Sequence, residues 1–104
     1  MKNEDFEITE EKIPDGIRFI IRGRINSIDA DELLQKMELA LNDGYKNIVL
    51  NMIQVEYLSS SGIRVILKSY KEAKGKGGKL GIEMPSANVK NVLGMTALED
   101  MLIQ

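Results

Sequence analysis

Three consecutive serines followed by a glycine, Ser59-Ser60-Ser61-Gly62, are the side chains of this sequence best suited to chemistry. They follow an apolar segment and directly precede a segment with helical periodicity. One of these hydroxyls is expected simply to cap the helix, because serine is a preferred N-cap residue. A hydroxyl there is also suited to carry a phosphate, since unpaired N–H groups and the positive end of the helix dipole lie at a helix start. Such a phosphate would add nearly two negative charges and could repel or recruit a partner, with Gly62 leaving space beside it.

The residue types that are missing exclude many kinds of active site. The chain has 104 residues, 14 basic and 16 acidic side chains, a net charge of −2, and neither cysteine nor histidine. It therefore has no disulfide, thiolate zinc site or iron–sulfur cluster, and no Ser–His or Cys–His pair. A serine hydrolase would need a lysine base, and no Ser-x-x-Lys pair occurs at the serine triplet. We expect a protein that is not an enzyme and holds no cofactor.

One acidic cluster could be considered as a metal site. Asp29, Asp31 and Glu32 lie close together in the sequence, at the start of a predicted helix. Acidic residues at that position are expected to cap the helix and to interact with its dipole. A hard cation would also need a fuller set of oxygen ligands, so we expect no metal.

Composition and length indicate one domain that spans residues 1–104. The sequence is 43% hydrophobic and 29% charged, as in ordinary globular proteins. Its acidic start is unlike a secretory signal, and no apolar run approaches the ~20 residues that span a bilayer. A nucleic-acid binder would normally show a strong basic excess with interleaved aromatic residues, which this sequence lacks. We expect a cytoplasmic protein that neither binds nucleic acid nor inserts into a membrane.

Apolar periodicity predicts an α/β fold that places the serine triplet between a buried strand and a helix. The expected strands are residues 6–9, 17–23, 46–53 and 79–84. The helices are expected to follow N-caps at Asp29, at the serine triplet and at Ser86. Residues 101–103 are either a last edge strand or a frayed end. The order β-β-α-β-α-β-α-(β) implies a mixed sheet of four to five strands with helices packed against it.

Two further local features can be predicted from the sequence. Pro14-Asp15-Gly16 is expected to form the turn between the first two strands, with a positive φ at Gly16. Methionines at apolar positions are expected to fill the core. These are Met37, Met52, Met84, Met95 and Met101.

A row of basic side chains follows the serines on the predicted second helix. Arg64, Lys68 and Lys71 occupy positions i, i+4 and i+7, which lie on one helix face. Such a row is most often just a solvated surface. Because it begins beside the serine triplet, it could instead border a phosphorylation site and contact an acidic groove of a partner. Both interpretations remain open from the sequence.

Four segments carry motifs whose order and spacing are informative together. Residues 57–63 read Tyr-Leu-Ser-Ser-Ser-Gly-Ile, residues 22–26 Arg-Gly-Arg-Ile-Asn, residues 77–80 Gly-Gly-Lys-Leu, and residues 92–98 Val-Leu-Gly-Met-Thr-Ala-Leu. Across residues 6–103 they resemble the STAS domain of bacterial anti-sigma-factor antagonists. At the first segment that family typically has an aromatic or apolar residue and then Asp-Ser-Ser/Ala-Gly-Leu. At the others it has a Gly-Glu/Asp-Leu-Asp turn, a Gly-Gly-x-Leu strand entry and a Leu-x-x-Thr/Ser-Gly-Leu segment.

The resemblance implies a switch protein. In that family the serine after the Asp is phosphorylated by a cognate kinase, which corresponds here to Ser60, with Ser59 and Ser61 as alternates. Ser59 stands in place of the family's Asp, and Asn26 stands where the family usually has another Asp. The implied partner is an anti-sigma factor of the GHKL serine-kinase type, bound before phosphorylation of Ser60 and released after it. The residues expected to contact this partner are Asn26, Ser59, Ser60, Ser61, Gly62, Arg64 and Lys68.

The same resemblance leaves a second function open. A constitutive STAS interaction module, such as a cytoplasmic accessory subunit of a lipid or anion transport complex, would keep the fold without needing a phosphoserine. The neutral Ser59 in place of the family's Asp is compatible with that alternative.

Overall fold

The elements follow one another in the order that the sequence predicts. The computed structural model describes residues 6–96 and 98–103. Its elements are β1 (Glu7–Ile13), β2 (Gly16–Ile25), α1 (Ser27–Asn42), β3 (Asn47–Leu58), α2 (Ser60–Gly75), β4 (Lys79–Glu83), α3 (Ala87–Met95) and a short 3-10 helix, η1 (Glu99–Met101). The predicted α/β class and the order β-β-α-β-α-β-α are confirmed.

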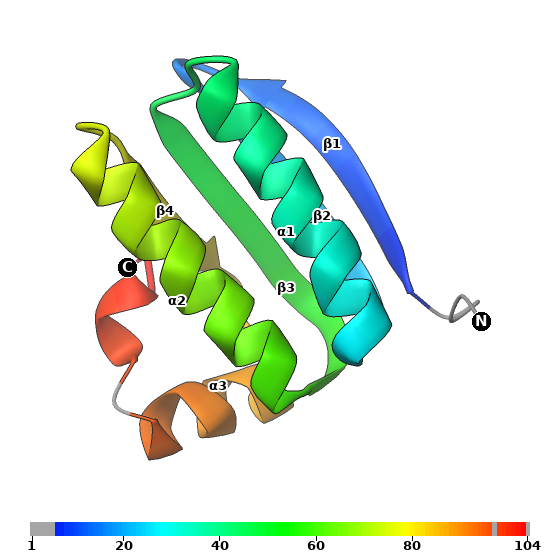
Figure 1. Cartoon of the computed structure of the whole chain (residues 1–104). Coiled ribbons are helices and arrows are strands. Elements are labelled where there is room, and N and C mark those ends of the chain that lie inside the picture. Colours follow the sequence, from blue (N-terminus) through cyan, green and yellow to red (C-terminus); the bar gives the residue numbers. More distant parts are fainter. Residues whose placement is uncertain (1–5, 97, 104) are drawn as a thin grey trace.

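The strands form one mixed sheet in the order β1-β2-β3-β4. β1 runs antiparallel to β2, whereas β2, β3 and β4 are parallel to one another. α1 connects β2 to β3, α2 connects β3 to β4, and the two helices lie side by side across one face of the sheet (Figure 1). Because β2 and β3 end at the same edge of the sheet, α1 and α2 begin at the same end of the molecule.

The core lies between the sheet and these two helices. Along β2 the buried Ile17, Phe19 and Ile21 alternate with more exposed side chains, as the two-residue repeat of a strand requires. They join one apolar cluster with Leu33 of α1 and Ile66 of α2. Full burial of each such side chain contributes roughly 1.5–3 kcal/mol, and this packing fixes where each helix begins.

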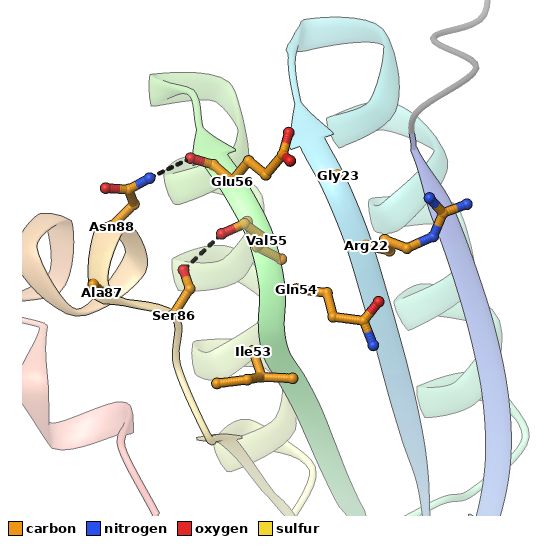
Figure 2. Close-up of a pocket in the computed structure, with 9 residues that line it drawn as sticks. All are labelled: Arg22, Gly23, Ile53, Gln54, Val55, Glu56, Ser86, Ala87 and Asn88. Atoms are coloured by element: carbon orange, nitrogen blue, oxygen red, sulfur yellow. Dashed lines mark hydrogen bonds between the residues drawn. The ribbon is translucent and has the colours of Figure 1, made fainter.

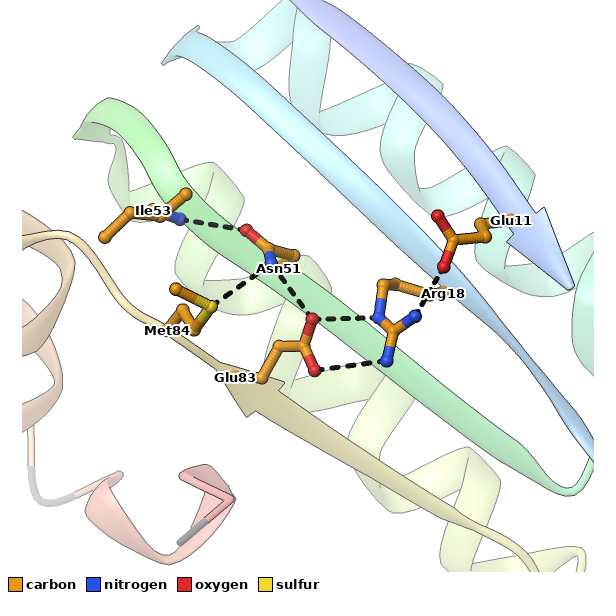
Figure 3. Close-up of polar contacts among 6 residues, drawn as sticks. All are labelled: Glu11, Arg18, Asn51, Ile53, Glu83 and Met84. Carbon is orange, nitrogen blue, oxygen red and sulfur yellow. Dashed lines mark hydrogen bonds and ion pairs between the residues drawn. The ribbon is translucent and has the colours of Figure 1, made fainter. Parts of the chain in front are cut away.

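The opposite face of the sheet carries a chain of polar contacts that crosses all four strands (Figure 3). Nη1 of Arg18 on β2 lies 2.6 Å from Oε1 of Glu11 on β1, and Nε of Arg18 lies 2.8 Å from Oε2 of Glu83 on β4. Nδ2 of Asn51 on β3 donates to the same Glu83 carboxylate at 2.9 Å. The hydrogen bonds to Glu11 and then Glu83 raise the pKa of the Arg18 guanidinium, so this cation stays charged.

Three predicted boundaries are wrong. β1, expected to end at residue 9, continues to Ile13, where it still pairs with β2. α1 follows an N-cap at Asn26 instead of Asp29, because Asn26 and Asp29 have the same capping-box spacing as Asp29 and Glu32 and complete the box in the structure. β3 continues past residue 53 to Leu58, where it still pairs with β2. The pairing continues because two irregularities in register, one of them next to Gly23 with φ 99°, let β2 follow the longer strand.

The turn between β1 and β2 also differs from the prediction. The positive φ belongs to Asp15, at 58°, and Gly16 does not have one. Gly16 is required for a different reason, since a Cβ there would lie 1.9 Å from the carbonyl oxygen of Asn47. The glycine therefore permits close approach of β2 to β3.

The C-terminal segment adds no full strand to the sheet. Within residues 98–103, Leu102 pairs with β4 through a single parallel bridge to Ile82, so the described part of the chain forms four of the predicted four to five strands. The methionine prediction holds in part. Met37, Met52 and Met101 are buried, but Met84 and Met95 are exposed because they lie at the ends of β4 and α3, where the core layer does not reach.

Candidate functional site

The serine triplet begins α2, and its first member is the N-cap. Ser59 has extended backbone angles, φ −71° and ψ 167°, and its Oγ accepts a hydrogen bond from the backbone N–H of Gly62 at 3.1 Å. The backbone N–H of Ser59 donates to the carbonyl of Ile25 at 3.0 Å. The backbone of Ser59 is thus attached to the end of β2, and its hydroxyl oxygen already accepts a hydrogen bond from α2.

The third serine contacts the neighbouring helix. The hydroxyl oxygens of Ser61 and Ser27 lie 3.3 Å apart, and either hydroxyl can be the donor. Ser27 is the first residue of α1. This pair therefore joins the two helix starts that Figure 1 shows at one end of the molecule.

The middle serine is the one that faces solvent. Ser60 is the first residue of α2 and is exposed, whereas Ser59 and Ser61 are half-buried. Within residues 6–96 and 98–103, the Ser60 hydroxyl has no hydrogen-bond partner. Of the three hydroxyls, that of Ser60 is therefore the most accessible to an enzyme that modifies serine.

Gly62 is buried beneath the helix start. A Cβ at this position would lie 2.6 Å from Cδ1 of Leu58 and 3.1 Å from Cγ2 of Ile25. The space that the sequence suggested for an approaching chain or nucleotide is filled by these two side chains. Gly62 instead lets the first turn of α2 pack directly on the ends of β2 and β3.

Asn26 caps the other helix that begins here. Its Oδ1 accepts hydrogen bonds from the backbone N–H groups of Ile28 and Asp29, both at 3.1 Å. In return, Oδ2 of Asp29 accepts from the backbone N–H of Asn26 at 3.2 Å. Asp29 is 1% exposed, so its carboxylate belongs to the capping box. In the described part of the chain, no group of three acidic side chains is arranged to hold a metal ion.

A shallow groove of about 370 Å³ runs between the first turns of α1 and α2. Its lining side chains are Ser27, Ala30 and Asp31 from α1, and Ser61, Arg64, Val65 and Lys68 from α2. Nζ of Lys68 lies 3.8 Å from a carboxylate oxygen of Glu38 and 4.0 Å from one of Glu72. The groove thus brings together Ser61, Arg64 and Lys68 of the predicted contact residues, while Asn26 and Ser59 lie at the helix caps.

Two exposed residues near the site were not predicted from the sequence. Arg24 at the end of β2 pairs in register with Tyr57 at the end of β3, and its guanidinium carbon lies 4.6 Å from the centre of the Tyr57 ring. Tyr57 is 44% exposed and lies two residues before Ser59. The alternation of arginine with glycine and isoleucine over residues 22–25 is the sequence signal that places Arg24 on the exposed face of β2.

A second hollow, of about 560 Å³, lies between the ends of β2 and β3 and the start of α3 (Figure 2). Oγ of Ser86, the predicted N-cap of α3, accepts from the N–H of Val89 at 3.2 Å and donates to the carbonyl of Val55 at 2.6 Å. Nδ2 of Asn88 donates to the carbonyl of Glu56 at 2.7 Å. These bonds attach α3 to the end of β3, and this hollow contains none of the predicted site residues.

Comparison with known proteins places this chain in a family. The model of the STAS domain family matches residues 8–103. BtrV of Bordetella bronchiseptica, whose name assigns it to the anti-sigma factor antagonists, is 28% identical over 74 residues, which cover 71% of this chain and 64% of BtrV. The aligned region therefore spans less than two thirds of that relative.

Two solved structures have the same fold. The anti-sigma factor antagonist SpoIIAA in its unphosphorylated form superposes with a TM-score of 0.83 at 18% identity, covering 93% of this chain and 86% of SpoIIAA. The phosphorylated form of SpoIIAA from Bacillus superposes with a TM-score of 0.78 at 16% identity, covering 93% and 89%. Among the residues that the structure describes, no helix is both long and apolar enough to cross a bilayer. Since the family model covers almost the whole chain, this protein belongs to the STAS domain family.

Proposed function

We propose that this protein is an anti-sigma-factor antagonist that acts by partner switching. Unphosphorylated, it binds an anti-sigma factor of the GHKL serine-kinase type, and phosphorylation of Ser60 releases it. The observation that carries the proposal is that the three serine hydroxyls differ in their contacts and exposure. Ser59 caps α2 and Ser61 contacts Ser27, which leaves the exposed Ser60 hydroxyl available.

The modification is a phosphoryl transfer from ATP, supplied with the kinase. A bond forms between Oγ of Ser60 and the γ-phosphorus, and the bond from that phosphorus to the departing ADP oxygen breaks. The hydroxyl proton passes to a base of the kinase. This chain needs to provide only an exposed hydroxyl on a rigid support, which agrees with a protein that lacks cysteine and histidine.

The charge that is added explains the release. Phosphoserine carries about −1.5 to −2 charges at neutral pH, so a surface that binds the neutral helix start meets a new anion after modification. The capping side chains Ser59 and Asn26 are neutral, and the carboxylates near this point, those of Asp29 and Asp31, belong to α1 and not to the start of α2. The modified and unmodified states therefore differ strongly in local charge.

The names of the relatives support the same proposal. BtrV and SpoIIAA are both assigned to the anti-sigma factor antagonists, and SpoIIAA exists in a phosphorylated form.

One observation favours a second candidate, a constitutive STAS interaction module, for example in a transport complex. The neutral Ser59 removes the charge that could help position the Mg-nucleotide of a kinase.

Site mapping of the phosphate tests the proposal. The protein is incubated with a GHKL-type serine kinase from the same organism and ATP, and its peptides are analysed by mass spectrometry. We expect one phosphate on Ser60, retained in Ser59→Ala and Ser61→Ala and lost in Ser60→Ala. No phosphate on Ser60, together with unchanged kinase binding by Ser60→Asp, would exclude the switch and favour the constitutive module.

A further inference from the structure

One cation beside the candidate phosphorylation site has no partner among the residues that the structure describes. Arg64 is exposed, and within residues 6–96 and 98–103 it forms no ion pair or hydrogen bond through its side chain. Lys68, the other base in the groove between α1 and α2, is shared between Glu38 and Glu72. Arg64 is thus the base in this groove that remains available to a new anion.

The helix geometry directs Arg64 toward Ser60. The two residues are four apart in α2, so they lie one turn apart on the same helix face. Helical side chains lean toward the N-terminus of their helix, so the Arg64 side chain is long enough to reach a phosphate on Ser60, which lies beside the groove that Arg64 lines. The hydroxyls of Ser27 and Ser61 line the same groove, and because one of them donates to the other, the pair keeps one hydroxyl hydrogen that it can donate to an anion.

We propose that Arg64, together with the hydroxyls of Ser27 and Ser61, holds the phosphate of phosphorylated Ser60 in the groove between α1 and α2. This inference rests on the proposed phosphorylation of Ser60. A guanidinium is well suited to the task, because its planar N–H groups match phosphate oxygens. The phosphate then closes the groove from within the chain, so the partner loses contact with α1 and Arg64 as well as meeting the added charge.

Other charges that face the groove act on the same phosphate. Asp31 on α1 lines the groove and opposes an anion, whereas Lys68 is shared between Glu38 and Glu72 at 3.8 and 4.0 Å. Arg24 lies at the end of the neighbouring strand, over the ring of Tyr57. Because Asp31 and Arg24 are the same in every variant compared below, their effects cancel in the comparison.

The second pKa of the phosphate measures this contact directly. Phosphoserine is introduced at position 60 during translation, and the phosphate is titrated by 31P NMR at low ionic strength. The variants Arg64→Gln and Lys71→Gln each remove one exposed positive charge from α2, but Lys71 lies two turns further from Ser60 than Arg64 does. We expect Arg64→Gln to raise the second pKa by roughly 0.2–0.7 pH unit and Lys71→Gln to leave it nearly unchanged.

Equal second pKa values in the Arg64→Gln and Lys71→Gln proteins would overturn the proposal. The phosphoserine is placed without a kinase, so this result does not depend on whether the kinase modifies Ser60. Failure of the proposed function would instead appear as missing phosphate on Ser60 after incubation with the kinase. Far-UV circular dichroism of each variant checks that its helices are intact.

Discussion

The hydroxyl oxygens of Ser27 and Ser61 lie 3.3 Å apart and join the first residue of α1 to the second residue of α2. The contact follows from the sheet, because β2 and β3 are parallel and the helices that follow them begin at one edge. The exposed Ser60 therefore lies at a junction of two helix starts. A charge added there affects a surface to which both helices contribute.

Replacement of the capping serine should destabilise the protein without touching the exposed hydroxyl. Ser59→Ala removes the acceptor of the Gly62 N–H, and we expect it to lower the free energy of unfolding by about 0.5–2 kcal/mol. Ser59→Asp keeps a capping acceptor and adds a favourable charge at the helix start, so its stability should be at least that of the wild type. Urea denaturation measures the free energy of unfolding of both variants. Equal stability of Ser59→Ala and wild type would show that this cap is dispensable.

The close packing at Gly62 predicts an unusual cost for alanine in a helix. Gly62→Ala should destabilise by about 1–3 kcal/mol, because its Cβ would lie 2.6 Å from Leu58. Gly75→Ala, at the other end of α2, is the matched control because a Cβ there meets no atom within 4 Å. There the higher helix propensity of alanine should stabilise by up to about 1 kcal/mol. Thermal and urea unfolding measure the change in the free energy of unfolding of each variant. A change of the same sign in both variants would contradict this account.

Ser69 on α2 is a buried polar residue whose hydroxyl is not expected to stabilise the fold. It is 1% exposed, and its hydroxyl has no hydrogen-bond partner among the described residues. A buried hydroxyl without a partner costs free energy, so Ser69→Ala should leave stability unchanged or raise it by up to about 1 kcal/mol. A loss of more than about 1 kcal/mol in urea denaturation would show that this hydroxyl does form a stabilising contact.

The polar chain on the open sheet face predicts unequal effects for two glutamates. Glu83 contacts both Arg18 and Asn51, whereas the more exposed Glu7 contacts Arg22 through one pair at 3.1 Å. Glu7→Gln should change stability by less than about 0.5 kcal/mol, as for most surface ion pairs. We expect Glu83→Gln to lower the free energy of unfolding by more than Glu7→Gln does, as measured by urea denaturation. The difference between the two variants should shrink at high salt. Equal effects of the two substitutions would mean that the chain across the sheet acts as isolated surface pairs.

The sequence predicts the fold well where apolar periodicity and turn residues agree. Ile17, Phe19 and Ile21 alternate as a half-buried strand should, and the apolar run from residue 48 requires a central position in the sheet. Ser59 and Ser86 are found at the N-caps because serine can satisfy backbone donors that a helix start leaves unpaired.

The remaining features depend on contacts between segments far apart in the sequence. The cap of α1 was misplaced because Asn26-x-x-Asp29 and Asp29-x-x-Glu32 have the same spacing, and only packing of the helix decides between them. The contact of Arg24 with Tyr57 depends on the register of β2 and β3 after two irregularities. The burial of Gly62 against Leu58 and Ile25 is likewise a tertiary property.

The affinity for the kinase partner tests the central claim most directly. The wild-type protein and the protein carrying phosphoserine at position 60 are titrated by calorimetry into the GHKL-type kinase with ADP bound, and Ser60→Ala serves as the neutral control. We predict that Ser60→Ala binds like the unphosphorylated protein and that phosphorylation weakens binding by at least roughly 100-fold, since a repulsive charge in an interface costs several kcal/mol. Equal affinity of the phosphorylated and unphosphorylated proteins would contradict the partner-switching account.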